Sequence, residues 1–518
     1  MHFTSHTPAD LCRHLADGWT MEQPGVAHEF IDRLRRRWLA GVESERPGAS
    51  SLRAVLEVDQ IHLLGASELG CLVLGNGAEV EREVGEFWQQ HGGGGRLALI
   101  LAATTALKET ARRFVPAGRC AFLGNGELES LLTHAQPLKL LKEHLRQQIP
   151  LSRLLPYDIT HPVAPNMFYG RRDILKRFHQ EETTSFAIAG PGRIGKSSLL
   201  KQYARELKRN RDGRYSRLTM IDCYPFAGLG PDALARSIAF EIGGDSHAAN
   251  VTTATLLKYL KYRFYHLSEH KPLELLLDEV DGVCRSEMME DLAEAVRVGY
   301  CRVILCGKGN LYALMRHRDS QFAKRLELLR PEPLDEESAG RLLFEPLADL
   351  GLQPQDREAM RQSIFDLTGR RPHLIQESAK ILFQFLETEG TPTITAQHLS
   401  RLREKFMEMS HTMLPLADMQ DDLTRLLVLL WLREGGGEVT VGTFQRLAGR
   451  HDLALSAAKT LDICDDLWIC NVLLWEGRSQ ALASSHLVEF VRKMDFSNEI
   501  SRLKLLVTQR QAQTAQDN

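Results

Sequence analysis

The sequence lacks the features of a membrane, disulfide-linked, zinc-binding or strongly charged protein. No run approaches the roughly 20 apolar residues of a membrane span, and the first residues show no signal-peptide pattern. The nine cysteines form no C-x-x-C pair and no zinc-ligand spacing, which favours a reduced environment. The net charge of −3 gives no overall attraction to nucleic acid or anionic membranes. From its 518 residues we expect about three to four domains in a soluble, cytoplasmic protein without membrane association.

Residues 1–150 are predicted to form a small α/β domain, for which the sequence indicates no function. Three apolar runs are typical of buried strands: residues 71–74, 97–101 and 120–123. Helical spacing is found at residues 28–40, 80–90, 127–133 and 137–148. Because strands alternate with helices, the pattern favours a small parallel sheet. Four prolines between positions 150 and 165 then predict an extended linker at residues 151–166.

The stretch at residues 185–200 reads SFAIAGPGRIGKSSLL. A short apolar run is followed by G-x-x-x-x-G-K-S and then by a helical pattern, which is the context of a phosphate-binding P-loop. Its glycines let backbone N–H groups surround a phosphate, and the helix N-terminus adds partial positive charge. The Lys196 ammonium can reach the β- and γ-phosphates, and the Ser197 hydroxyl can coordinate Mg²⁺. We predict that a nucleoside triphosphate contacts Gly190, Pro191, Gly192, Arg193, Ile194, Gly195, Lys196, Ser197 and Ser198.

A second motif follows the apolar run at residues 273–277, where the chain continues with Asp278 and Glu279. Downstream of a P-loop, such an acidic pair at the end of a strand is typical of a Walker B motif. Asp278 would hold Mg²⁺ through its water shell, and Glu279 would orient and activate the attacking water. Hydrolysis is therefore chemically possible, with Glu279 and Lys196 as catalytic residues. No N-K-x-D guanine-reading motif is found, which favours ATP over GTP.

Two further motifs flank these. Residues 168–175 read FYGRRDIL, twenty positions ahead of the P-loop, and residues 367–374 read LTGRRPHL. Together with the P-loop and the Walker B motif, they resemble the STAND class of signalling ATPases and their archaeal-ATPase relatives. The resemblance covers about residues 165–495. The second motif departs from the usual T-G-G-x-P pattern, because Arg370 stands where a second glycine is common.

The resemblance implies a multidomain α/β architecture. It predicts a P-loop NTPase core at residues 167–334 with an ASCE-type parallel sheet, a helical lid at 335–410 and a winged helix at 411–495. We expect the wing from strands at 468–474 and 480–483, and a helix end with a disordered tail at 496–518. Polar residues dominate beyond position 506, which is typical of disorder.

The resemblance also implies roles for individual residues. Tyr169, Gly170 and Arg171 would lie against the adenine and ribose. Arg370 or Arg371, next to Pro372, would meet the γ-phosphate as a "sensor 2" arginine. Arg325 is a candidate arginine finger for a neighbouring subunit, although a plain surface arginine fits its position equally well. At residues 307–310, either Lys308 or Asn310 would be the polar "sensor 1" group, or the segment is a surface turn.

Three functions remain open at this point. In the STAND class, ATP and ADP states differ in lid and winged-helix packing, and the ATP state assembles homo-oligomers under a trigger or protein partner. The first hypothesis is such a switch, with the N-terminal domain as effector or adaptor. The second is a DNA-handling ATPase of the origin-recognition type, which is disfavoured because the third helix of the expected winged helix carries Asp462, Asp465 and Asp466. The third is a nucleotide-stabilised scaffold that hydrolyses nothing.

Overall fold

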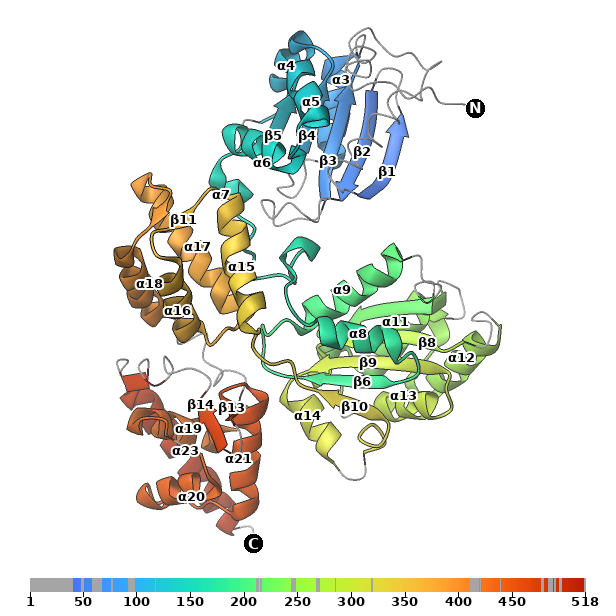
Figure 1. Ribbon diagram of the computed structural model, residues 1–518. Helices are drawn as coiled ribbons and strands as arrows, with labels where there is room; N and C mark the ends of the chain where they lie inside the picture. The colour runs from blue at the N-terminus through green and yellow to red at the C-terminus, as the bar shows by residue number, and fades with distance from the viewer. Residues whose placement is uncertain are drawn as a thin grey trace. The chain divides into compact units, whose positions relative to one another are not determined.

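The computed structural model (Figure 1) separates into two compact units. Unit 1 comprises Met1–Phe168, Arg341–Gln355 and Ala379–Thr395, and unit 2 comprises Tyr169–Gly340, Asp356–Ser378 and Ala396–Asn518. Within the described part of the chain, no helix is long and apolar enough to span a bilayer. The structure describes residues 41–47, 51–57, 68–75, 78–91, 98–116, 118–210, 214, 217–243, 248–266, 271–284, 286–317, 320–409, 419, 421–437, 439–476, 479–482, 488, 491–492 and 496–516.

The N-terminal sheet of unit 1 is mixed. Its strands, in spatial order, are β1 (Gly41–Pro47), β2 (Ser51–Glu57), β3 (Glu68–Leu74), β4 (Ala98–Ala102) and β5 (Cys120–Leu123). Strands β3, β4 and β5 coincide with the predicted strands and are parallel, whereas β1 and β2 are antiparallel strands that the sequence analysis did not predict. The helices are α3 (Val80–His91), α4 (Thr105–Arg112), α5 (Asn125–Thr133) and α6 (Pro137–Gln148). The predicted helix at 28–40 lies outside the described residues.

The segment predicted as an extended linker packs closely instead. It contains α7 (Leu151–Leu154) and the 3-10 helix η2 (Pro165–Met167). Leu154 and Tyr157 are buried, and the Tyr157 hydroxyl donates to the Leu343 carbonyl oxygen over 3.1 Å. The prolines restrict the backbone as expected, but the apolar side chains between them bind the segment to the rest of unit 1.

Unit 2 is built on a five-stranded parallel sheet. Its strands are β6 (Ser185–Ala189), β7 (Leu218–Asp222), β8 (Leu273–Asp278), β9 (Cys301–Gly307) and β10 (Leu326–Leu329), in the spatial order β10-β6-β9-β8-β7. Strand β9 thus separates the P-loop strand β6 from the Walker B strand β8, and all neighbours pair in parallel. The carboxyl ends of all five strands therefore meet at one edge. The predicted parallel-sheet P-loop NTPase core is confirmed.

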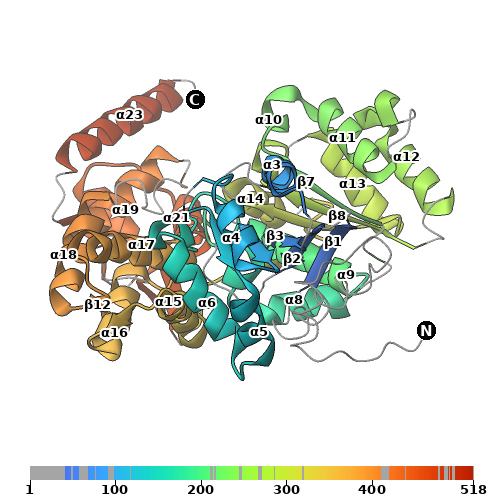
Figure 2. The same cartoon turned by 90° about the horizontal axis from the view of Figure 1, so that it is seen from above.

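Helices cover both faces of this sheet. In the view from above, α8 (Arg172–Gln180) and α9 (Lys196–Arg209) lie on one side, and α10 (Phe226–Leu229), α11 (Pro231–Gly243), α12 (Thr253–His266) and α13 (Glu287–Arg297) lie on the other (Figure 2). Three short elements complete the core: η4 (Ala248–Asn250), η5 (Val280–Gly282) and α14 (Gly309–Arg316). Between α9 and the sheet, the buried Glu274 carboxylate of β8 accepts hydrogen bonds from Arg302 of β9 and from the Tyr203 hydroxyl of α9.

Four helices follow the core: α15 (Glu336–Asp349), α16 (Arg357–Thr368), α17 (Pro372–Glu389) and α18 (Ala396–Met409), close to the predicted helices. The sequence analysis missed a pair of parallel strands, β11 (Gln353–Pro354) and β12 (Thr393–Ile394). In the sequence, β11 lies between α15 and α16, and β12 lies between α17 and α18. Gly369 ends α16 in the left-handed conformation, and Pro372 begins α17, as each residue type favours. This explains why the T-G-R-R-P segment separates two helices.

A C-terminal bundle completes unit 2. It consists of α19 (Asp422–Glu434), α20 (Val441–Arg450), α21 (Ala457–Ile469), the antiparallel hairpin β13 (Leu473–Glu476) and β14 (Ser479–Leu482), and α23 (Ser497–Gln516). Two predictions are wrong here. Trp468 belongs to α21 rather than to a strand, and the tail beyond residue 506 is helical, because α23 packs against α19 and buries Leu503 and Val507.

Candidate functional site

The P-loop connects β6 to α9 at the carboxyl edge of the sheet. Its first residue, Gly190, donates its N–H to the Gly307 carbonyl oxygen at the end of β9 over 3.2 Å. Gly195 has a φ of +102°, a backbone conformation that glycine adopts readily. The Lys196 side chain is only 4% exposed, and its Nζ donates to the carbonyl oxygens of Gly190 (2.9 Å) and Pro191 (2.8 Å). The predicted phosphate-binding residues therefore form one closed loop with the lysine folded across it.

The Walker B carboxylates stand beside this loop. The Ser197 hydroxyl donates to the buried Asp278 carboxylate, whose Oδ1 also accepts the Glu279 N–H over 3.0 Å. Burial raises the pKa of Asp278, and the Ser197 bond opposes that rise. Burial likewise raises the pKa of Glu279, against the opposing charges of Lys196 and Lys308. A carboxylate with a raised pKa is better suited to accept a proton near neutral pH.

The two sensor 1 candidates differ in their contacts. The Asn310 side-chain amide donates to the Asp281 carbonyl oxygen over 3.2 Å, which turns it toward the Walker B turn. Lys308 acts electrostatically on Glu279. Both residues therefore stay candidates for the polar group after β9, Lys308 through its charge and Asn310 through its amide. Sequence reasoning missed Asp281, although its position three residues after Asp278 was a visible signal.

The motif at residues 168–175 contacts the P-loop. Gly170 and Arg171 have φ values of +75° and +62°, and Arg171 Nη2 donates to the Ile194 carbonyl oxygen over 3.3 Å. Burial lowers the pKa of Arg171 to about 10, against the charges of Asp173, Glu332 and Asp335. Tyr169 is buried beside them. The predicted base-binding segment and the predicted phosphate loop are thus in direct contact.

Comparisons with known proteins agree with this geometry. A family model described as an AAA domain matches residues 179–315. This chain contains an AAA-type P-loop NTPase domain. The fold of the AAA domain is an ATP-binding one, and the match lies within the predicted core. No curated protein matches the sequence.

Three solved structures show distant similarity to this chain. The Walker-type ATPase PABY2304 of Pyrococcus abyssi is 14% identical, with 63% of this chain and 96% of that chain covered and a TM-score of 0.46. The Aeropyrum pernix ORC2 protein is 16% identical over 65% and 92% of the two chains, with a TM-score of 0.42. A variant of the Thermotoga maritima RuvB protein is 15% identical over 61% and 92%, with a TM-score of 0.34. Such distant similarity identifies no substrate or partner.

The three candidate arginines lie in different surroundings. Arg325 immediately precedes β10, and because Leu326 pairs with Ser185 at the start of β6, it stands at the edge of the sheet opposite the P-loop. Arg370 has a φ of +57°, and its carbonyl oxygen accepts the Leu334 N–H over 3.0 Å. Arg371 is buried, and its Nη2 donates to the carbonyl oxygens of Cys470 (2.7 Å) and Asn471 (2.9 Å). Arg371 thus holds the end of α21, a contact that sequence reasoning did not foresee.

Arg330 and Asn471 make a second contact between the core and the C-terminal bundle. Arg330 Nη1 donates to Asn471 Oδ1 over 2.6 Å and to the Trp468 carbonyl oxygen over 2.8 Å. Asn471 Nδ2 in turn donates to the Pro331 carbonyl oxygen over 3.0 Å. The Arg330 guanidinium also lies 4.1 Å from the centre of the Trp468 ring, within the range of a cation–π interaction. We call Arg330, Arg371 and Asn471 the latch.

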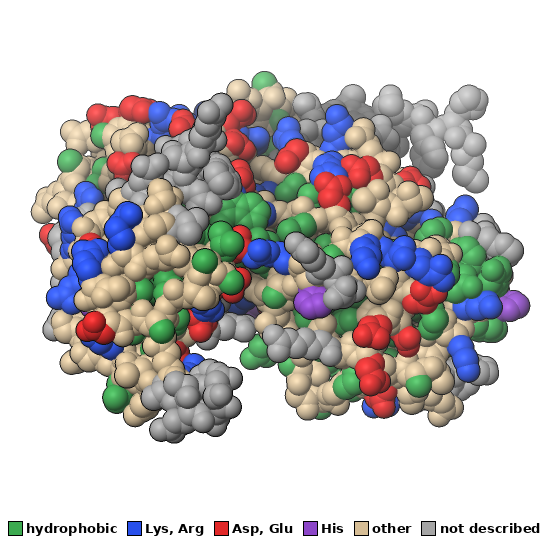
Figure 3. Space-filling model, turned by 90° about the horizontal axis from the view of Figure 1, so that it is seen from below, with side chains coloured by type: hydrophobic (Ala, Val, Ile, Leu, Met, Phe, Trp, Pro, Cys, Tyr) green, Lys and Arg blue, Asp and Glu red, His purple; other side chains and the backbone are tan. Residues whose placement is uncertain are grey.

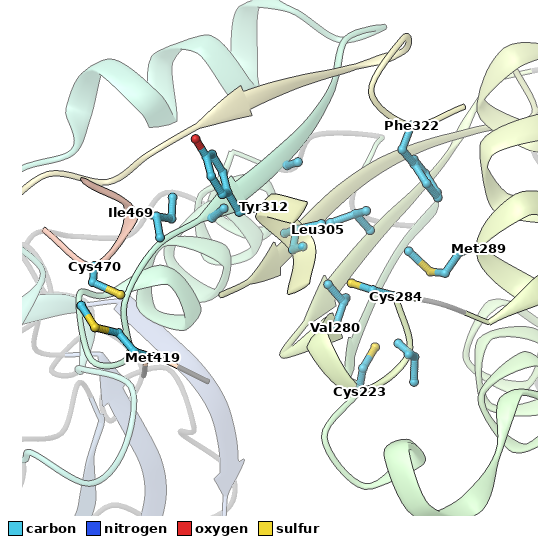
Figure 4. Packing of buried hydrophobic residues seen from close by; sticks show 14 of the residues in the cluster. Cys223, Val280, Cys284, Met289, Leu305, Tyr312, Phe322, Met419, Ile469 and Cys470 are labelled. Carbon is cyan, nitrogen blue, oxygen red and sulfur yellow. The ribbon is translucent and has the colours of Figure 1, made fainter. Parts of the chain in front are cut away.

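The latch brings the bundle against the phosphate-binding edge of the AAA domain. A cavity of about 170 Å³ lies between them. In Figure 4, Ile469 lies near Tyr312 of α14, and Cys470 lies beside Met419. The cavity is lined by Gly190, Pro191, Lys308, Gly309, Asn310, Met419, Asp421, Asp466, Ile469 and Cys470. Residues of the P-loop and of the C-terminal bundle therefore line one cavity, which is partly open.

Proposed function

We propose that the chain is an ATP-hydrolysing switch, in which the nucleotide state of the AAA domain controls the packing of the C-terminal bundle. The observation that supports this most is the shared cavity, where Gly190 and Pro191 of the P-loop face Asp466 and Cys470 of the bundle. A ligand phosphate at the P-loop would therefore meet the bundle directly. The proposal includes the prediction that this bundle is a winged helix, whose order of three helices and a hairpin it has.

The residues of the site fit a nucleotide and Mg²⁺. The P-loop N–H groups, the N-terminus of α9 and Lys196 would hold the phosphates, and the segment at 169–171 would contact the base. Ser197 and Asp278 provide the hard oxygen ligands that Mg²⁺ prefers. When bound, Mg²⁺ would neutralise phosphate charge. Glu279 would accept a proton from the attacking water, as its raised pKa favours.

Charge explains how the nucleotide would act on the bundle. The bundle contributes the carboxylates of Asp421 and Asp466 to the cavity. Phosphate oxygens at the P-loop would repel both carboxylates, and the docked bundle would become less favourable. A ligand shifts such an equilibrium by its difference in affinity for the two states. The docked arrangement would thus be the state that the γ-phosphate disfavours.

Assembly and partners follow from the same proposal. Arg325 lies at the edge opposite its own P-loop, so a role as arginine finger would require a neighbouring subunit. We propose that the ATP state forms a homo-oligomer, and that the N-terminal domain serves as effector or adaptor for a protein partner or trigger.

DNA handling is the weaker alternative. Recognition by the third helix of a winged helix needs that helix to be accessible. In this chain α21 pairs Asp465 with Arg316 of the core and offers Asp466 to the cavity. Among the described side chains on the face shown in Figure 3, acidic and basic groups are interspersed. DNA-stimulated phosphate release at physiological salt would revive this alternative.

The test measures particle size and phosphate release together, with ADP and then with ATP–Mg²⁺. Lys196→Ala is expected to lose nucleotide binding, whereas Lys201→Ala on the same helix is the matched control and should behave as wild type. Glu279→Gln is expected to bind ATP, to release no phosphate and to form the larger particle. Normal hydrolysis by Glu279→Gln would refute the assignment of the base. Bound nucleotide without any phosphate release from the wild type would favour a scaffold.

A further inference from the structure

Asp281 accepts hydrogen bonds at both carboxylate oxygens and at its carbonyl oxygen. Its Oδ2 accepts the Lys308 N–H over 2.5 Å, and its Oδ1 accepts the N–H groups of Asn310 (2.9 Å) and Leu311 (3.4 Å). Its carbonyl oxygen accepts from the Asn310 side chain. These N–H groups belong to the end of β9 and the first turn of α14, where backbone donors have no partner within the helix. One carboxylate thereby joins the turn after β8 to the start of α14.

The neighbouring glycine makes room for this carboxylate. A Cβ atom at Gly307 would stand 2.7 Å from Asp281 Oδ2 and 2.8 Å from the Leu311 Cβ. Both distances are shorter than contacts that real Cβ atoms make, so any larger residue at position 307 would displace Asp281 or α14. Gly307 also accepts the Gly190 N–H with its carbonyl oxygen. Gly307, which binds the P-loop, and Lys308, which binds Asp281, are therefore consecutive residues at the end of β9.

The turn that Asp281 holds carries Glu279. Glu279 has a φ of +50° and a ψ of +46°, a left-handed conformation that is unfavourable for a residue with a side chain. Such a conformation persists only where the surroundings fix it. Asp278 accepts the Glu279 N–H on one side, the Val280 side chain is fully buried, and Asp281 is bound on the other side. The position of Glu279 is thus fixed from both ends of the turn.

We propose that Asp281 is a positioning residue for ATP hydrolysis, because it holds the turn with Glu279 in register with Lys308 and the P-loop. The inference rests on the proposed ATPase function. It separates two tasks within the D-E-V-D segment: Asp278 and Glu279 act at the nucleotide, and Asp281 acts on their geometry. A displacement of about 1 Å at a reacting group can lower a rate about a hundredfold.

The experiment compares Asp281→Ala with Asp356→Ala. Asp356 accepts the Ala359 N–H at the start of α16 and gives the matched loss of a helix cap away from the Walker B turn. We expect Asp281→Ala to lower kcat about a hundredfold while KM for ATP changes less than about twofold. Asp356→Ala should lower Tm with kcat unchanged. Asp281→Asn keeps one acceptor oxygen and should recover part of kcat.

A second variant tests the same contact from the other side. Gly307→Ala leaves the Asp281 carboxylate intact but removes its space, and it should lower kcat in the same way. Equal loss of kcat in Asp281→Ala and Asp356→Ala would overturn the inference, as would a wild-type kcat in a folded Asp281→Ala protein. Failure of the proposed function is distinguishable, because the wild type itself would then release no phosphate, and the inference would fall with it.

Discussion

Asn471 offers the sharpest test of the latch. Asn471→Ala removes the hydrogen bond from Arg330, a charged donor, and the neutral one to the Pro331 carbonyl oxygen. Net contributions of about 2 and about 1 kcal/mol are typical of such bonds, which gives about 3 kcal/mol in total. Arg330 keeps the Trp468 carbonyl oxygen as an acceptor, so no buried charge is stranded. The docking equilibrium should therefore shift about a hundredfold toward the undocked bundle.

The assay is single-molecule fluorescence transfer between a dye at the residue after α13 and a dye on α21. Val298 and Leu461 are exposed and can be replaced by cysteine, with Cys12 and the partly exposed Cys464 replaced by serine. Asn471→Ala should increase the low-transfer population, in which the bundle is undocked. The rate of phosphate release by this variant should rise together with that population.

The control for this assay separates the latch from backbone strain. Asp452→Ala removes another polar residue with positive φ (+56°) from the same bundle, and it should leave the populations unchanged. If Asn471→Ala changes the population ratio by less than about twofold, which is under about 0.5 kcal/mol, the latch does not hold the bundle.

Three further predictions concern stability. Glu274→Gln leaves the buried Arg302 without its counter-ion and should cost about 3–5 kcal/mol in urea unfolding, whereas a paired replacement of both residues by methionine should cost less. Burial raises the pKa of Asp466 to about 6, so the folded chain binds this proton more tightly than the unfolded one. Its contribution to stability should therefore fall as pH rises from about 4 to about 6, and Asp466→Asn should abolish that part of the pH dependence of Tm. Truncation after residue 506 removes the buried Val507 and should cost about 2 kcal/mol or more, measured by denaturant unfolding.

Local patterns in the sequence predicted the strands of the P-loop NTPase core well. The apolar runs of β6, β8 and β9 are buried on both faces, and their hydrophobicity is visible without any knowledge of partners. Asp278 ends β8, Glu279 follows it, and Lys196 lies at the end of the loop after β6, so parallel pairing of the strands brings these residues to one edge. Such residues are predictable because strand order places them.

Contacts between distant segments were not predictable in the same way. The motif makes Arg370 or Arg371 a candidate for contact with the γ-phosphate, but it gives no sign that Arg371 Nη2 donates to carbonyl oxygens at the end of α21. Asn471 looks like an ordinary residue after a helix, and only its left-handed backbone and the approach of Arg330 give it a role. The helix in the C-terminal tail was not predicted because most of its residues are polar. The burial of two apolar side chains, Leu503 and Val507, stabilises it.

Helix α14 has different neighbours at its two ends. Asp281 holds its first turn beside the Walker B motif, while Arg316 in its last turn pairs with Asp465 of α21. An eight-residue helix is only about 12 Å long, so one short element joins these two contacts. A genetic screen for altered turnover should therefore recover substitutions on α21 that never approach the nucleotide. Such substitutions would affect the Walker B turn through the C-terminal end of α14. Without the structure, the substituted residues would be mistaken for catalytic residues.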